Sequence, residues 1–261
     1  MESYFIETAC QIADQSRTIV ERAFRRPFDI SLKPDASPVT AVDLAVENLI
    51  RTELRTRFPT HSVQGEEYEA LQGNSEYTWI IDPIDGTKAF ACGKPLFGTL
   101  IALLKNEIPI LGIIDQPITK ERWIGIVDRP TQLNNQIIQT SQVNSLSSAK
   151  LSCTTPDMFT TSSAQNTVNQ LKKAVQLTSF GGDAYAFGCL AAGYIDVILE
   201  AQLKFHDVAA LIPIINGAGG ILTDWQGNPI TASFNGECLC TANEKLHEVA
   251  LRLIGSNNLH V

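Results

Sequence analysis

The chain has 261 residues, 44% of them hydrophobic and 18% charged, with a formal net charge of −8. This apolar content is enough for a substantial core and argues against a disordered chain. The acidic balance argues against a nucleic-acid-binding surface, and the lack of a long uncharged apolar run argues against a membrane-spanning helix. The six cysteines lack the paired spacing of a zinc site. Because no basic segment followed by an apolar run opens the chain, we expect no signal peptide and a cytoplasmic protein.

The first 58 residues predict two helices with a short strand between them. Apolar residues recur at helical spacing over residues 3–24, and residues 30–33 predict a strand that is followed by a loop over 34–38. A second helix is predicted over residues 40–58. Its apolar face is expected to consist of Ala41, Leu44, Ala45, Leu49 and Leu54.

Several charged residues near these elements have ordinary structural explanations. Asp43 stands three residues after Thr40, where an acidic side chain supports the start of a helix. Lys33 is typical of a solvated charge, and Glu66 and Glu67, at the end of a probable strand, are typical of an exposed acidic pair. Composition by itself therefore assigns none of these residues to a site.

The stretch that begins at Trp79 has more chemical content. Residues 79–81 predict a short buried strand, and Asp82 and Asp85 flank the turn that follows it. Two carboxylates in so small a volume repel each other unless a cation neutralises them, and hard ions such as Mg²⁺ take such oxygen ligands. Gly86 and Thr87 then offer an unhindered backbone and a hydroxyl, suited to phosphate oxygens if a helix begins there. A plain surface turn accounts for the same composition.

The middle of the chain predicts strands and then a change of subdomain. Residues 97–104 and 108–114 predict an antiparallel hairpin, and 123–127 predict a further strand. Residues 129–149 are rich in Asn, Gln, Ser and Thr. We therefore divide the single domain into an N-terminal half, residues 1–142, and a C-terminal half, residues 143–261.

The C-terminal half mixes short strands with helices. Asp183 and Asp207 stand at predicted helix starts, where each is explained equally well as a helix N-cap. The irregular mixture favours a layered α+β fold over a regular alternation of strand and helix. The predicted strands are 151–154, 194–200 and 221–225, and the predicted helices are 167–174, 183–193, 208–212 (interrupted by Pro213) and 243–254.

Three motifs occur in a fixed order along the chain. They are Gly65-Glu66-Glu67, Asp82-Pro83-Ile84-Asp85-Gly86-Thr87 and His206-Asp207-Val208-Ala209-Ala210, the last followed by a glycine-rich run over 217–220. Together they resemble the inositol monophosphatase-like family of Mg²⁺-dependent, lithium-sensitive phosphatases, and the resemblance extends from residue 33 to about residue 224. It implies an α/β/α/β/α sandwich of the inositol monophosphatase and fructose-1,6-bisphosphatase type, a metal site between its two halves, and a homodimer.

The resemblance also implies roles for individual residues. Two or three Mg²⁺ ions would be held by Glu66, Asp82, Asp85, Asp207 and the carbonyl of Ile84. Catalytic roles fall to Glu66, Thr87 and Asp43, with water as the nucleophile and no phosphoenzyme. Lys33 and Glu67 would support the metal loop, and His206 is given no role because inositol-type enzymes commonly carry Trp there. The residues expected to bind substrate are Gly86, Thr87, Asp183, Tyr185 and Glu200.

The substrate is expected to be a small phosphorylated molecule, with no nucleic-acid or membrane partner. Asp115-Gln116-Pro117 and Gly181-Gly182-Asp183-Ala184-Tyr185 resemble the histidinol-phosphatase branch, which favours L-histidinol phosphate and a place in histidine biosynthesis. Asp183 and Glu200 suit this substrate because they can pair with a cationic amine or imidazole. The alternatives are inositol monophosphate or a related sugar phosphate and, from another class, a non-catalytic regulatory binding protein.

Overall fold

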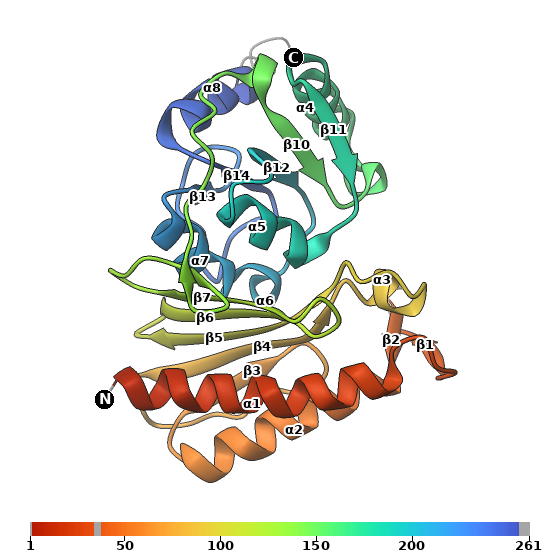
Figure 1. The fold of residues 1–261 in the computed structure, drawn as a ribbon, viewed down its shortest axis with the longest axis vertical. Coiled ribbons are helices and arrows are strands. Elements are labelled where there is room, and N and C mark those ends of the chain that lie inside the picture. The colour runs from red at the N-terminus through yellow and green to blue at the C-terminus, as the bar shows by residue number, and fades with distance from the viewer. Residues whose placement is uncertain (1, 34–37, 256–261) are drawn as a thin grey trace.

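The computed structural model describes residues 2–33 and 38–255, and it shows five layers (Figure 1). Two helices, α1 and α2, cover one face of a seven-stranded sheet, and α5 and α7 separate that sheet from a five-stranded one. α4 and α8 cover the outer face of the second sheet. The predicted α/β/α/β/α sandwich is confirmed. The helices are α1 (Glu2–Ala23), α2 (Ala41–Arg57), α3 (Thr87–Ala91), α4 (Ser162–Ala174), α5 (Asp183–Ala191), α6 (Phe205–Val208), α7 (Leu211–Ala218) and α8 (Glu244–Gly255), with 3₁₀ turns η1 (Leu146–Ser148) and η2 (Pro156–Met158).

The seven-stranded sheet has its strands in chain order, from β3 to β9. β3 and β4 are parallel, and every later pair is antiparallel, which confirms the predicted hairpin of β5 and β6. A separate antiparallel pair, β1 and β2, precedes α2. These strands are β1 (Ile30–Leu32), β2 (Pro38–Thr40), β3 (Ser62–Gly65), β4 (Tyr77–Asp85), β5 (Gly98–Lys105), β6 (Ile108–Gln116), β7 (Glu121–Ile126), β8 (Gln132–Leu133) and β9 (Gln136–Ile137).

The five-stranded sheet has the order β11-β10-β12-β14-β13. β10 runs parallel to both β11 and β12, whereas β14 runs antiparallel to β12 and β13. Two of these strands, β11 and β14, are absent from the sequence-based prediction. The strands are β10 (Lys150–Cys153), β11 (Leu177–Phe180), β12 (Val197–Glu200), β13 (Ile221–Thr223) and β14 (Cys238–Thr241).

Alternation along the strands divides the apolar core. Trp79 and Ile81 of β4 pack in a cluster under α1 and α2, while Ile80 packs in the cluster between the two sheets. Successive strand residues point to opposite faces, so β4 contributes to both clusters. A third cluster, which includes Leu246, lies under α4 and α8. Asp82, two residues after Ile80 in β4, is thereby aimed between the sheets, where α6 contacts β4.

The buried face of α2 differs from the prediction. Leu44 is 38% exposed, and Ala41 and Ala45 are exposed as well. The helix is rotated so that polar residues are buried with apolar ones, because those polar side chains find hydrogen-bond partners inside the protein. The buried residues are Val42, Asp43, Val46, Glu47, Ile50, Arg51 and Leu54, of which only Leu54 was predicted.

Smaller differences concern helix boundaries. Pro213 does not interrupt a helix, because it is the third residue of α7, where a missing backbone N–H costs no intrahelical hydrogen bond. α4 begins at Ser162, five residues before the predicted start, with Thr161 as a capping residue. The predicted loop over 34–38 falls mostly on residues 34–37, which lie outside the described residues, and Pro38 begins β2. Within residues 2–33 and 38–255, no helix has both the length and the apolar character to cross a membrane.

Candidate active site

The end of β4 directs two acidic residues into the space between the sheets. Asp82 lies two residues after Ile80 and shares its face. The pairing of β4 with β5 shifts register between Asp82 and Asp85, and an irregularity of this kind re-aims side chains. Asp85 accepts a hydrogen bond from the backbone N–H of Ala184 in α5. The end of β4 is therefore tied directly to the C-terminal part of the fold.

The loop after β3 carries Glu66 and is held by a carboxylate of α2. Glu47 is fully buried and accepts hydrogen bonds from the backbone N–H groups of Glu67 at 2.8 Å and Tyr68 at 3.2 Å. A Cβ on Gly65 would lie 2.0 Å from Glu47 Oε1, so a residue without a side chain is needed for this close approach. Glu47 thus fixes the position of the loop from which Glu66 extends.

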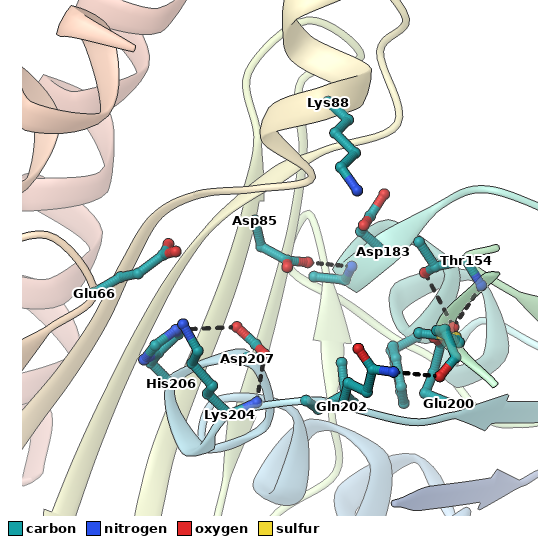
Figure 2. Close-up of a pocket in the computed structure, with 14 residues that line it drawn as sticks. Glu66, Asp85, Lys88, Thr154, Asp183, Glu200, Gln202, Lys204, His206 and Asp207 are labelled. Atoms are coloured by element: carbon teal, nitrogen blue, oxygen red, sulfur yellow. Dashed lines mark hydrogen bonds and ion pairs between the residues drawn. The ribbon is translucent and has the colours of Figure 1, made fainter. Parts of the chain in front are cut away.

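The third carboxylate comes from α6. Asp207 Oδ2 accepts a hydrogen bond of 2.7 Å from the backbone N–H of Lys204, the residue that caps the helix. Asp207 is thus the third helical residue rather than the N-cap. His206 Nε2 lies 3.3 Å from Asp207 Oδ1. Figure 2 shows Glu66, Asp85 and Asp207 pointing into a common space from three separate elements.

The acidic groups form two overlapping clusters. Ligand atoms of Asp82, Asp85 and Asp207 lie within 4.8 Å of one another, and so do those of Glu66, Asp82 and His206. Burial, reinforced by the carboxylate of Glu66, raises the pKa of Asp82 well above its ordinary value. Burial, reinforced first by the carboxylate of Asp183, raises the pKa of Asp85 in the same way. Both aspartates are therefore electrostatically unfavourable in their ionised form when no cation is bound.

The donor atoms fit a hard divalent cation. Asp82 is 1% exposed, and its Oδ1 has no hydrogen-bond partner within the described part of the chain. A buried carboxylate oxygen without a donor is costly, and a coordinated cation removes that cost. Carboxylate and carbonyl oxygens are the ligands that Mg²⁺ prefers. The residues present therefore suit a Mg²⁺ site in which Asp82 belongs to both clusters.

Lys33 and Glu67 lie beside this loop, as the resemblance implies. Lys33 Nζ is 2.6 Å from Glu66 Oε1 and 2.8 Å from Glu67 Oε1. Burial raises the pKa of Glu67 to about 7. Burial also opposes the charge on Lys33, but the hydrogen bonds to both glutamates outweigh it and raise the lysine pKa above its ordinary value. The lysine thus offsets part of the negative charge next to the cluster.

Asp43 supports the start of α2, as predicted, and also contacts Thr87. It accepts a hydrogen bond of 2.9 Å from the backbone N–H of Thr40, which completes the capping box of α2. Its other oxygen lies 3.3 Å from Thr87 Oγ1, and that hydroxyl is also 3.0 Å from the carbonyl oxygen of Ile84. Burial raises the pKa of Asp43. The residue at the start of α2 therefore reaches the turn that follows β4.

Gly86 joins β4 to α3 in a conformation that favours glycine. Its φ is +92°, and a Cβ would lie 2.9 Å from the carbonyl oxygen of Leu96. The helix begins at Thr87, as the prediction for this stretch required, and its N-terminus has no side-chain cap. The backbone N–H groups of this turn lie next to the carboxylate clusters.

A cavity of about 630 Å³ extends from the clusters towards the five-stranded sheet. Glu200, at the end of β12, accepts hydrogen bonds from the N–H and hydroxyl of Thr154 at 2.8 and 3.0 Å, and its Oε2 is buried without a partner among the described residues. Burial raises the pKa of Glu200 to about 8 and that of Asp183 to about 6. Asp183 is the first residue of α5 with Gly182 as the cap, and in Figure 2 Lys88 points towards it.

The structure does not bring Tyr185 to this cavity. Its hydroxyl donates a hydrogen bond of 2.8 Å to Glu121, and its ring packs edge-on against Trp123. Asp183 and Tyr185 therefore project to different sides of α5, because positions two residues apart on a helix are rotated by about 200°. Asp183 lines the cavity, whereas Tyr185 packs on the seven-stranded sheet.

Two residues of the site were not predicted. Glu47 acts through backbone groups twenty residues further along the chain, and its own position within α2 gives no sign of this. His206 was given no role, yet one of its ring nitrogens belongs to a cluster of potential metal ligands. Its place beside Asp207 in the third motif was the available signal.

The comparisons with known proteins agree with this geometry. A histidinol-phosphatase of Chlorobaculum parvum is 30% identical over 96% of this chain and 96% of that protein. The bifunctional phosphatase IMPL2 of Arabidopsis thaliana, described as chloroplastic, is 41% identical over 92% of this chain and 72% of that protein. A solved inositol monophosphatase from Zymomonas mobilis superposes with a TM-score of 0.88 at 39% identity and covers 97% of this chain and 98% of its own.

Fold and site together define a phosphatase built around a buried cluster of carboxylates. The chain belongs to the inositol monophosphatase family, which it matches over residues 1–258.

Proposed function

We propose that this phosphatase is a Mg²⁺-dependent phosphomonoesterase that hydrolyses L-histidinol phosphate to L-histidinol and phosphate, in histidine biosynthesis. The observation that carries the substrate assignment is the acidic far wall of the cavity, where Glu200 Oε2 is buried with no partner among residues 2–33 and 38–255, and Asp183 lines the same cavity. A protonated amine or imidazole would satisfy both groups with charge-assisted hydrogen bonds. The names of the bacterial relatives that share about 30% identity support the same substrate.

The metal-binding part of the proposal uses the two carboxylate clusters. Glu66, Asp82, Asp85, Asp207 and the carbonyl of Ile84 would hold two or three Mg²⁺ ions. When bound, Mg²⁺ supplies Lewis-acid chemistry that makes water a stronger nucleophile and offsets charge on the leaving oxygen. Bound cations also allow a phosphorylated substrate to approach a protein with a net charge of −8.

The chain's own groups would position the reactants. The Thr87 hydroxyl, which lies between Asp43 and the Ile84 carbonyl, would orient the attacking water together with Glu66. The backbone N–H groups of Gly86 and Thr87 would donate to the phosphoryl oxygens. Because water attacks directly, no protein side chain has to carry the phosphoryl group.

Phosphate release with Mg²⁺ tests the substrate assignment. We expect kcat/KM for L-histidinol phosphate to exceed that for inositol 1-phosphate by ~100-fold, which corresponds to about 2.7 kcal/mol in the transition state. A preference for inositol 1-phosphate would overturn the assignment and favour the second candidate, which the tomato inositol monophosphatases at about 31% identity support. Activity that persists in excess chelator would contradict the metal-dependent mechanism.

The cavity wall is tested separately. Asp183→Asn keeps the shape of the side chain but removes its charge, so we expect it to reduce kcat/KM for L-histidinol phosphate much more than for inositol 1-phosphate. Asp29→Asn, at an exposed aspartate that lines neither this cavity nor the one beside it, serves as a matched control. Equal losses for both substrates would show that Asp183 does not recognise a cationic group.

A non-catalytic binding protein is the alternative from another class. Asp85→Asn should nearly abolish phosphate release if the chain is an enzyme, whereas a binding role that is independent of hydrolysis should survive. The homodimer implied by the resemblance and the cytoplasmic location expected from the sequence belong to this proposal, and sedimentation of the purified chain tests the first of them.

A further inference from the structure

His206 lies where the two carboxylate clusters meet. One of its ring nitrogens is within 4.8 Å of carboxylate oxygens of Glu66 and Asp82, and its Nε2 is 3.3 Å from Asp207 Oδ1. In Figure 2 its ring stands between Glu66 and Asp207 on the floor of the cavity. The side chain is 12% exposed, so it lines the interior of the site rather than the surface.

An independent observation indicates that this corner of the site binds a cation. Asp82 is almost fully buried, and its Oδ1 has no donor within the described part of the chain. Asp82 is also the member that the two clusters share. An oxygen in this state requires either a proton or a cation, and the nearest non-carboxylate ligand to it in the same cluster is the imidazole of His206.

We propose that His206 is a nitrogen ligand of the cation bound by Glu66 and Asp82, and that this position accepts a borderline transition cation such as Co²⁺ or Zn²⁺ as well as Mg²⁺. Imidazole nitrogen suits such cations, whereas Mg²⁺ prefers oxygen ligands almost exclusively. One nitrogen among carboxylate oxygens therefore shifts the preference of the site towards the transition metals. The inference rests on the metal site of the proposed function and is independent of the substrate.

The contact between His206 and Asp207 is compatible with this role. At 3.3 Å it is longer than the 2.7–2.9 Å typical of a charge-assisted hydrogen bond, so a cation competes with it at little cost. Metal-binding histidines also commonly keep a carboxylate at the second ring nitrogen, which sets the orientation of the ring. Asp207 is in place for that function or for coordination in the second cluster.

Pulsed electron paramagnetic resonance of the Mn²⁺-loaded full-length protein tests the inference directly. We expect a ¹⁴N coupling to Mn²⁺ that changes when histidine is labelled with ¹⁵N, and that is lost in His206→Gln. His61→Gln is the matched control, because His61 accepts a hydrogen bond from Trp79 in the aromatic cluster under α1 and should leave the coupling intact. Absence of nitrogen coupling in the wild type, or its persistence in His206→Gln, would overturn the inference.

Calorimetry supplies a second readout with the metals alone. Loss of an outer-sphere partner of a metal typically weakens metal binding by ~10-fold or more. Because His206 is proposed to be a direct ligand, we expect His206→Gln to weaken Co²⁺ binding by at least that much and Mg²⁺ binding by less. An equal loss for both cations would contradict a nitrogen ligand. If His206→Gln does not fold, the ¹⁵N-labelled wild type still decides the question.

The two proposals fail in different ways. Nitrogen coupling without phosphate release from either substrate would support the ligand and refute the proposed function. Phosphate release with Mg²⁺ but without nitrogen coupling would support the proposed function and refute His206 as a metal ligand.

Discussion

Two buried aspartates of the seven-stranded sheet, on strands that flank β5, have opposite surroundings. Asp82 of β4 and Asp115 of β6 are each 1% exposed. Asp115 receives hydrogen bonds of 2.6 and 3.1 Å from Arg17 and one of 2.6 Å from Arg122, so its charge is balanced within the protein. Asp82 has four carboxylates nearby and one oxygen with no donor among the described residues.

Register explains why two similar residues have different roles. Across the sheet, Asp82 is opposite Leu100, and Leu100 is opposite Ile114, one residue before Asp115. Because side chains alternate, this single step places Asp82 between the two sheets and Asp115 on the face covered by α1, the helix that carries Arg17. A balanced buried charge holds helix and sheet together, whereas an unbalanced one is suited to bind an external cation.

The largest expected effect is that of Asp82→Asn on activity. A bound metal stabilises transition-state charge by several kcal/mol, so loss of this ligand should lower kcat/KM on the order of 10³-fold. At neutral pH the same change should raise the melting temperature of the metal-free protein, because the fold disfavours the ionised carboxylate whose pKa it raises. Addition of Mg²⁺ should then no longer raise that melting temperature as it does in the wild type. A metal-free variant less stable than the wild type would show that Asp82 is a structural charge.

The matched substitution in β6 should have the opposite effect on stability. Asp115→Asn leaves Arg17 and Arg122 without their shared carboxylate, and breaking a buried ion pair costs roughly 3 kcal/mol. We expect a lower denaturation midpoint in urea with kcat/KM for the remaining folded protein changed little. Asp14 still pairs with Arg122 at 2.7 Å and limits the loss. A large fall in kcat with unchanged stability would reverse the roles assigned to the two aspartates.

Glu47 resembles Asp115 because it is a buried carboxylate paired with an arginine, Arg51. It resembles Asp82 because it acts on the carboxylate clusters, by holding the loop of Glu66. In Glu47→Gln an amide group would face backbone N–H donors, so the loop should shift. We expect a ~10–100-fold loss of Mg²⁺ affinity, the range typical of outer-sphere residues, and partial recovery of activity at high Mg²⁺. Glu53→Gln, on the exposed part of the same helix, is the control. A loss that high Mg²⁺ does not reduce would indicate a purely structural role.

The irregular mixture of strands and helices predicted an α+β fold, and the resemblance of three short motifs to a known family implied the five layers and the grouping of acidic residues that the structure shows. The sequence predicted the wrong face of α2 because hydrophobic spacing treats every acidic residue as exposed. Asp43 and Glu47 are buried on that helix, and their partners lie in distant turns that the local sequence does not reveal. The short strand β14 was missed for a related reason, since its four residues are defined by pairing with β12 and β13.

His247 is a third type of buried titratable group, and its contribution to the free energy of unfolding should be the smallest of the effects predicted here. His247 of α8 is 6% exposed, and its two ring nitrogens lie 3.0 Å from the hydroxyls of Thr223 and Thr241. A neutral imidazole can donate to one hydroxyl and accept from the other, and burial lowers the pKa of His247 to about 4. Burial therefore favours the uncharged form of His247 in the folded protein.

The pH dependence of unfolding tests this difference. Between the ordinary histidine pKa of about 6.5 and the lowered value, the unfolded chain binds a proton that the folded chain does not. The free energy of unfolding should therefore fall as pH decreases through this window, by about 1–2 kcal/mol between pH 7 and pH 5. Subtracting the urea unfolding free energies of His247→Gln from those of the wild type at each pH cancels the contribution of the carboxylates. A difference that is constant from pH 7 to pH 5 would mean that the folded protein accommodates a charged His247, and that burial near the five-stranded sheet is less restrictive than at Asp82.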